Sequence, residues 1–473
     1  MLSLIMIMVD VVNLWVDNFT FVKFFIWLYG IIILGCDDMK KRSTANKILL
    51  VILFILLAMA IYALYKSYQE EKPTEQNDPI VVDPQNNQSE PKEIELPKAK
   101  ETYLNNVVNS SGSTIKDGWQ DIIVNYLDLY TKSLVYLETE DVTSLFTDPS
   151  GNEAYLTQTT VDFIVSHHKL QPNDMKLEDA YYDIEYKSVN INGNKVTIVF
   201  LEDDYHKFNF VDDDIFSRVI DVENTVVINK SETGEYTLDS VRVVKDHYVM
   251  FTNVLSPSDG KGAIDNLKNK YLGLIEEEAT KNKALLEEAN TTSYEAPKTC
   301  DHVYGREEAV NYANKYADAR NSEYYDFSRD GGNCANYASQ SIHAGGIPMD
   351  YKGDAIWKYY SAAPDYTNNP VGRTASWTAV NYFYRYARDN SGFGLCSDID
   401  VNIFYGEGGD VLQVGYNPDN PYTHTTIVVD RVVKDGKVLD LLLDSNTVGL
   451  YKYPALGYTY QNKRLIKILG YND

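Results

Sequence analysis

Cysteine is scarce in this sequence of 473 residues. Four cysteines are present, at Cys36, Cys300, Cys334 and Cys396. Four cysteines in a chain of this length exclude a disulfide-rich scaffold and a cysteine-rich zinc module. Any chemistry that depends on sulfur must therefore rest on very few thiols.

Basic residues are also outnumbered. The chain has 43 lysines and arginines against 68 aspartates and glutamates, which gives a formal net charge of −25 and a sequence pI near 4.7. A chain this acidic repels phosphate backbones and anionic lipid headgroups, so nucleic-acid binding is set aside. The hydrophobic fraction of 44% is close to the globular average, so the chain has enough apolar material for folded cores.

Long apolar runs are confined to the amino terminus. Residues 48–65 (ILLVILFILLAMAIYALY) carry no charge, and a run of this length can cross a bilayer. Lys40, Lys41 and Arg42 precede the run, and positive flanks stay in the cytoplasm, so we expect the rest of the chain to lie outside. The run is either a retained anchor, which predicts a membrane protein with extracellular domains, or a cleaved signal, which predicts a secreted one.

Two interpretations of residues 1–38 stay open. Met39, followed at once by basic residues, is typical of a bacterial signal or anchor start, which would make residues 1–38 an upstream extension. Otherwise these residues supply an extra hydrophobic segment before the basic flank.

Composition divides the rest of the chain. Residues 66–100 are rich in proline and polar residues and predict a disordered acidic stalk. Residues 101–262 combine two helical patterns with alternating runs, and Asn192-Gly193-Asn194 between two of these runs is a hairpin signal. This pattern predicts an α+β accessory domain, similar in outline to NTF2-like or cystatin-like domains. Residues 263–295 favour a helical spacer, and residues 296–473 form the last domain.

The accessory domain carries no predicted chemistry. Its histidines and acidic clusters, such as Glu202-Asp203-Asp204, are typical of helix ends and solvated loops. We therefore expect neither a metal site nor a cofactor.

The strongest chemical signal is Gly331-Gly332-Asn333-Cys334. A helical pattern over residues 306–320 precedes it and a helix-compatible run, residues 335–344, follows, so Cys334 is expected at a loop-to-helix junction. The amino terminus of a helix stabilises a thiolate, and the glycines allow a substrate carbonyl close to the backbone. The pattern favours a nucleophile over the alternative, a small buried cysteine.

A thiol nucleophile needs a base, and two histidines follow Cys334 in the sequence. His343 lies on the same predicted helix, about 13 Å from Cys334, so it cannot reach the sulfur. His424, which opens a strand-like run, is the predicted base. Asn446 and Asp444, at the end of the next strand, are the candidates for orienting the imidazole, and Asn446 is preferred.

The residues around Cys334 also resemble the sequence signature of a known protein family. Residues 331–340 (GGNCANYASQ), followed by Ala344-Gly345-Gly346, closely resemble the signature of the putative amidase domain family of Gram-positive bacteria. Trp357, Ser376-Trp377 and Gly409-Asp410 match further positions of that family, over about residues 300–473. The resemblance implies a papain-like fold, related to NlpC-type and CHAP-type cell-wall hydrolases.

The resemblance also implies roles for single residues: Cys334 as nucleophile and His424 as base. Asn446-Thr447 occupies the place where the family often has a polar His-Thr. Asn333 and Ala335 depart from the family, which usually has aspartate and threonine there. Neither departure removes the nucleophile or the base.

These features predict an extracytoplasmic, membrane-anchored cysteine amidase or peptidase with a triad of Cys334, His424 and Asn446. The thiol would form a thioester with an amide, and water would resolve it. The expected substrate is a peptide or peptidoglycan-like amide in the cell wall. The alternatives are a catalytically silent papain-fold binding module and a transglutaminase-like acyl transferase.

Other residues keep two interpretations each. Asn333, Asn336 and Gln340 either donate to the oxyanion or merely cap the helix. Trp357 and Trp377 either line the substrate groove or belong to the core. Outside the membrane, Cys300 and Cys396 either form a disulfide or stay as thiols.

Overall fold

The computed structural model describes residues 100–212, 214–255, 259–353, 355–416 and 421–473. The predicted membrane segment at residues 48–65, its basic flank and nearly all of the predicted stalk lie outside these ranges. Among the described residues, no helix is both long enough and apolar enough to cross a bilayer.

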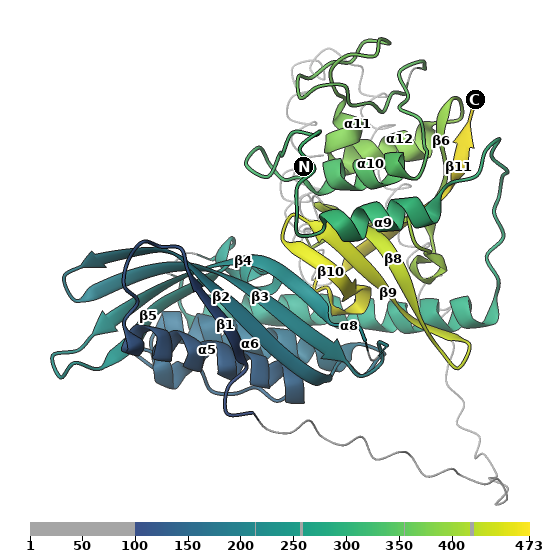
Figure 1. Ribbon diagram of the computed structural model, residues 1–473. Helices are drawn as coiled ribbons and strands as arrows, with labels where there is room; N and C mark the ends of the chain where they lie inside the picture. Colours follow the sequence, from purple (N-terminus) through teal and green to yellow (C-terminus); the bar gives the residue numbers. More distant parts are fainter. Residues whose placement is uncertain (1–99, 213, 256–258, 354, 417–420) are drawn as a thin grey trace, which may run out of the picture. The chain divides into compact units, whose positions relative to one another are not determined.

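The accessory half, residues 100–255, consists of a twisted sheet with helices packed on one face (Figure 1). Its helices are α5 (Asp117–Tyr136), η1 (Thr143–Leu145), α6 (Asn152–Leu170) and α7 (Asp246–Thr252). Its strands are β1 (Leu104–Asn109), β2 (Leu177–Asn192), β3 (Lys195–Phe208), β4 (Ser217–Lys230) and β5 (Tyr236–Val243). Strands β2 to β5 pair antiparallel in sequence order, and β1 runs parallel to β2.

The sequence pattern explains this layer structure. Side chains of β3 alternate between buried and more exposed along the whole strand, because successive residues of a strand point to opposite faces of the sheet. The buried set includes Ile198 and Phe200, and α5 and α6 add Tyr126 and Phe163 to the same core. The predicted hairpin is confirmed at Gly193, whose φ of 62° is the left-handed backbone that glycine adopts without strain.

The C-terminal half, residues 300–473, packs helices against a second group of strands. Its helices are α9 (Arg306–Tyr316), α10 (Cys334–Ala344), α11 (Ala375–Thr378), α12 (Val380–Asp389), η2 (Ile403–Tyr405) and η3 (Ala455–Gly457). Its strands are β6 (Gly394–Val401), β7 (Val411–Gly415), β8 (His424–Lys434), β9 (Lys437–Asn446), β10 (Gly449–Pro454) and β11 (Asn462–Asn472).

One sheet runs through both halves. Its strand order is β1-β2-β3-β4-β10-β9-β8-β7-β11-β6, and β5 pairs with β4 beside this path. The halves join where β10 pairs antiparallel with β4, with Gly449 opposite Ile220. A Cβ at position 449 would lie 2.8 Å from the Cβ of Ile220, so glycine permits the close approach. The mixed α+β class predicted from the sequence is therefore confirmed. Strands from both sides of the predicted domain boundary at residue 262 belong to one sheet.

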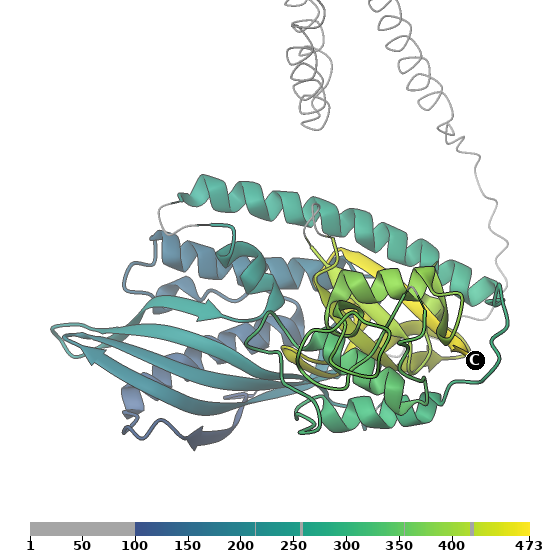
Figure 2. The ribbon, with the colours of Figure 1, turned by 90° about the horizontal axis from the view of Figure 1, so that it is seen from above.

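Helix α8 (Lys261–Thr291) extends along both halves (Figure 2). On the accessory side, Lys268 forms an ion pair of 2.9 Å with Asp162 of α6. On the other side, Asn290 exchanges two hydrogen bonds with the backbone of Val438, at the start of β9. The residues expected to form a spacer thus form a helix that packs against both halves.

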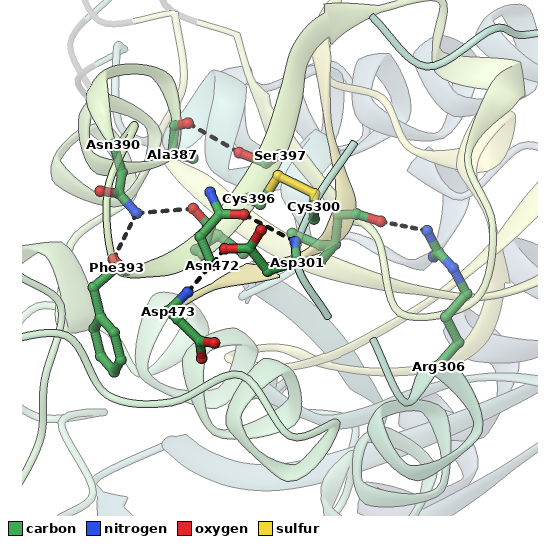
Figure 3. Close-up of a disulfide and its surroundings, with 12 residues drawn as sticks. Cys300, Asp301, Arg306, Ala387, Asn390, Phe393, Cys396, Ser397, Asn472 and Asp473 are labelled. Carbon is green, nitrogen blue, oxygen red and sulfur yellow. Dashed lines mark hydrogen bonds between the residues drawn. A yellow bond between two sulfur atoms is a disulfide. The ribbon is translucent and has the colours of Figure 1, made fainter. Parts of the chain in front are cut away.

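A disulfide joins Cys300 to Cys396, with Cα atoms 6.1 Å apart (Figure 3). It ties the segment before α9 to β6. Next to it, the N–H of Asp301 donates to Oδ1 of Asn472, which holds the same segment against β11. The pairing left open by the sequence is therefore formed, and Cys334 is the free cysteine within the described ranges.

Candidate active site

Cys334 is the first residue of α10, at the loop-to-helix junction expected from the sequence. Gly331 and Gly332 precede it with φ values of 104° and 112°, a left-handed backbone that favours glycine. The loop therefore turns sharply before the helix and delivers the thiol at the helix amino terminus.

Asn333 fixes this loop from inside the protein. Its Oδ1 accepts from the backbone N–H of Phe327 at 3.1 Å and from Nδ2 of Asn336 at 2.8 Å. Its Nδ2 donates to Oδ1 of Asn446, 3.3 Å away, and its backbone N–H donates to Oγ1 of Thr447, 2.8 Å away. An aspartate at position 333 could not donate to Asn446, so asparagine suits this neighbour.

The Cys334 thiol is buried, with 7% of the residue exposed. Burial raises the pKa of the thiol, and the backbone N–H groups of Thr425, Ala335 and Cys334 itself partly oppose that rise. The thiol is therefore protonated near neutral pH. Thr425 directly follows His424, so the sulfur faces the strand at the residue next to the predicted base.

His424 opens β8, and its Nε2 lies 2.9 Å from Oγ of Ser445. Burial lowers the pKa of His424 to about 4, so the imidazole is neutral near neutral pH. On another side, the ring of Tyr458 is nearly parallel to the imidazole, at 16°, with the ring centroids 6.1 Å apart.

The predicted triad is arranged differently from the expectation. Asn446 contacts Asn333, and Oδ1 of Asp444 accepts from the backbone N–H of Lys452 at 2.7 Å. The side chain within hydrogen-bond distance of Nε2 of His424 is that of Ser445, which lies between the two candidates. Neighbouring residues of a strand point to opposite faces, so Ser445 faces the histidine and the residues beside it face away. In the described part of the chain, no hydrogen bond joins the Cys334 sulfur to His424.

The strand end Ser445-Asn446-Thr447 nevertheless connects the two predicted catalytic residues. Ser445 binds the His424 ring, while Asn446 and Thr447 bind the loop that carries Cys334. Arg320 adds a 2.6 Å hydrogen bond to the backbone carbonyl of Asn446. Three consecutive residues therefore fix the base and the nucleophile loop relative to each other.

The two tryptophans belong to the core. Trp357 and Trp377 are fully buried, with ring centroids 4.5 Å apart. Nε1 of Trp377 donates to Asn336, and Nε1 of Trp357 donates to Ser339. Both rings therefore bind side chains of α10.

Two of the three side chains offered as oxyanion donors, Asn333 and Asn336, use their amide N–H groups in hydrogen bonds within the protein. Nδ2 of Asn336 donates to the carbonyl of Tyr325 as well as to Asn333, and Oε1 of Gln340 accepts from the hydroxyl of Tyr312. Backbone N–H groups beside the sulfur are the better candidates for holding an oxyanion. Among the residues that the structure describes, no group of histidine, cysteine and carboxylate side chains has the arrangement of a metal site.

Comparison with known proteins agrees with the resemblance of the C-terminal half. The family model described as "Putative amidase domain" matches residues 303–469, which include Cys334, His424 and Ser445. The Bacillus subtilis (strain 168) protein YhbB, described as uncharacterized, is 35% identical over 134 residues, which are 27% of this chain. The alignment spans 38% of YhbB. No solved structure matches. The domain match supports an amidase-type hydrolase.

Proposed function

We propose that the C-terminal half is a cysteine-dependent amidase with Cys334 as nucleophile and His424 as general base. The observation that carries the proposal is the position of the thiol: it lies at the start of α10 and faces the backbone N–H of Thr425, next to His424. Ser445 would orient the imidazole by accepting a hydrogen bond from Nε2–H, which leaves Nδ1 without a proton. The Nδ1 atom would then take the thiol proton.

Burial raises the pKa of Cys334 and lowers that of His424, and both shifts disfavour proton transfer before the sulfur attacks. Because burial keeps the thiol and the imidazole neutral, the proton would move from sulfur to His424 while the sulfur attacks the amide carbonyl. Catalytic hydrogen bonds are often long in a substrate-free enzyme and tighten when substrate binds. The oxyanion would accept hydrogen bonds from backbone N–H groups, and His424 would return the proton to the leaving amine. Water would then hydrolyse the thioester.

We propose an amide of cell-wall peptide as the substrate and a membrane anchor at residues 48–65 as the attachment. The support for an extracytoplasmic site is the basic flank before that apolar run and the Cys300–Cys396 disulfide. Disulfides persist mainly in oxidising compartments. An enzyme tethered there meets wall peptides before other amides.

The test is digestion of purified Gram-positive peptidoglycan by the full-length protein. We expect new amino groups and product masses that have gained one water molecule per cut, and neither with Cys334→Ala. Equal product release by Cys334→Ala would contradict the proposal. Products that carry an added amine in place of water would indicate acyl transfer.

A binding module without catalysis is the second candidate. The raised pKa of Cys334 favours it, as does the lack, within the described ranges, of a hydrogen bond between the sulfur and His424. Binding to peptidoglycan without any product, by the wild type and by Cys334→Ala alike, would establish this alternative.

A further inference from the structure

The residues that follow η3 lie beside the predicted base. The ring of Tyr458 stacks on His424 at 16°, with the centroids 6.1 Å apart, which is within the range of offset aromatic contacts. The ring therefore limits the orientations open to the imidazole. What holds Tyr458 in place bears directly on the geometry of the base.

A buried lysine holds the backbone around Tyr458. Nζ of Lys463, on β11, donates to the carbonyl of Tyr458 at 3.3 Å and to that of Tyr460 at 2.9 Å. The same ammonium forms an ion pair of 2.6 Å with Glu278 of α8. Only 3% of the lysine side chain and 5% of the glutamate side chain are exposed, so each charge depends on the other.

Further contacts reach the same segment. The buried ring of His167, on α6, lies against the backbone carbonyl of Tyr458, and His168 lies against that of Gly457. From β9, Asp440 accepts from the backbone N–H of Leu456. Part of the contacts around the Tyr458 backbone therefore come from α6 and α8. Both helices precede the residues that match the amidase family.

We propose that α8 is a built-in support of the active site: Glu278, through Lys463, holds Tyr458 against His424 and so positions the base. Glu278, Lys463 and Tyr458 are positioning residues in this scheme. The scheme rests on the proposed function for the role of His424. It gives the part of the chain before residue 303 a task in catalysis that the family match does not cover.

Two pairs of variants of the full-length protein test the scheme. Glu278→Gln removes the charge beside Lys463 with little change of shape, and Glu277→Gln, at an exposed position of the same helix, is its matched control. Tyr458→Leu removes the stacking ring, and Tyr458→Phe keeps it. Thermal unfolding and thiol counting verify that each variant is folded with its disulfide closed.

Two readouts separate positioning from folding. The first is the set of His424 ring signals in 15N-histidine NMR, assigned with His424→Gln. The second is the rate at which p-nitrophenyl acetate acetylates Cys334, followed by intact mass. We expect Glu278→Gln and Tyr458→Leu to shift the ring signals and to slow acetylation about 10-fold. The variant Glu277→Gln should behave as the wild type, and Tyr458→Phe, which keeps the ring, should stay closer to the wild type than Tyr458→Leu does.

The possible results are distinct. Unchanged ring signals and rates in Tyr458→Leu overturn the scheme, even if Glu278→Gln fails to fold. If the wild type is acetylated no faster than His424→Ala, the proposed function fails instead, and the positioning scheme falls with it. A third result also overturns the scheme: the wild type is acetylated faster than His424→Ala, and Tyr458→Leu shifts the ring signals but leaves the rate of acetylation unchanged. The action of the base would then not depend on Tyr458.

Discussion

The two halves of this protein bury histidines by the same physics and place them among different neighbours. Burial lowers the pKa of His206 in the accessory half to about 3 and that of His424 in the C-terminal half to about 4. The lining of a cavity of about 50 Å³ includes His206, Asp204 and Lys245 and, from the C-terminal half, Tyr458. His424 lies next to the residue that faces the Cys334 thiol.

Burial sets the protonation state of both histidines, and their neighbours differ. Burial keeps the imidazole neutral in either half and opposes its protonation. In the C-terminal half, Ser445 on the neighbouring strand contacts the ring, and the Cys334 thiol faces the backbone N–H of Thr425, the residue after His424. The accessory half instead encloses an ion cluster, in which Lys245 pairs with Glu202 at 3.0 Å and with Asp204 at 2.8 Å. Lys245 thereby balances two buried carboxylates, whereas His424 is the proposed general base.

The largest expected effect separates the two kinds of histidine. His424→Ala should slow acylation of Cys334 by about 10² to 10⁴-fold, because a general base contributes that much. His206→Ala should leave the rate per folded molecule within about twofold of the wild type, a change worth less than 1 kcal/mol of barrier. Acylation kinetics of both variants, followed by mass, check this, and equal effects would refute the contrast.

The ion cluster should matter for stability. Lys245→Met leaves two buried carboxylates without their cation and should lower the free energy of unfolding by about 3–5 kcal/mol. Lys187→Met breaks a pair with Glu185 that is more than a third exposed, and should change it by about 0–1 kcal/mol. Denaturant unfolding of both variants measures the difference, and similar losses would show that the cluster is not structural.

The disulfide should stabilise the C-terminal half. Cys300 and Cys396 are 96 residues apart, and opening a loop of this length should lower the free energy of unfolding by about 2–4 kcal/mol. Thermal unfolding of Cys300→Ser/Cys396→Ser measures it. The double variant tests the disulfide without exposing Cys334 to reductant. An unchanged melting temperature would show that the bridge is dispensable.

As the pH falls, the free energy of unfolding should decrease at a higher pH than the one at which His424 becomes protonated. Unfolding restores the ordinary histidine pKa near 6.5, so the unfolded chain binds more protons than the folded chain between pH 6.5 and the lowered values. Stability should therefore fall as the pH drops below 6.5, by about 1.4 kcal/mol per pH unit for each such group. Substituting His206 by glutamine should flatten that slope in pH-dependent unfolding.

Activity should decline at a lower pH than the one at which stability begins to fall. His424 stays neutral down to a pKa of about 4, so kcat/KM per folded molecule should hold to about pH 5 and decline as the pH falls through 4. A limb near 6.5 would mean that the imidazole is solvated as in a free histidine.

The smallest expected effect sharpens the role of Ser445. Removing one hydrogen bond of this kind is worth about 0.5–1.5 kcal/mol, so Ser445→Ala should slow acylation about 2- to 10-fold. Asn446→Ala should act instead through the loop that Asn333 holds, and His424 ring signals in NMR should tell the two variants apart. If Asn446→Ala moved those signals more than Ser445→Ala, the assignment of the orienting residue would be reversed.

Local signals in the sequence revealed the residues that carry the proposed chemistry. Two glycines before a helical pattern located Cys334 at a helix start, and a strand-like run located His424 at a strand start, because both depend on neighbouring residues. Ser445 was missed because register decides which of three consecutive polar residues meets the ring. The alternation of β9 was visible in the sequence, but its alignment with β8 was not.

Contacts between distant segments could not be predicted. The pairing of β4 with β10 joins Ile220 to Gly449, and no local pattern in either strand names the other. Glu278 and Lys463 are 185 residues apart, and each looks like a solvent-exposed charge until the fold buries both. For the same reason, the residues of the predicted spacer gave no sign that they pack beside the candidate active site.

The most direct measurement is the mass of the protein after brief exposure to p-nitrophenyl acetate at pH 7, with peptide mapping of the modified residue. The expected result is one acetyl group on Cys334 in the wild type, formed at least 100-fold more slowly in His424→Ala and absent from Cys334→Ala. Acetylation of Cys334 at the same rate with and without the histidine, or no acetylation there at all, would contradict a Cys334–His424 nucleophile and base.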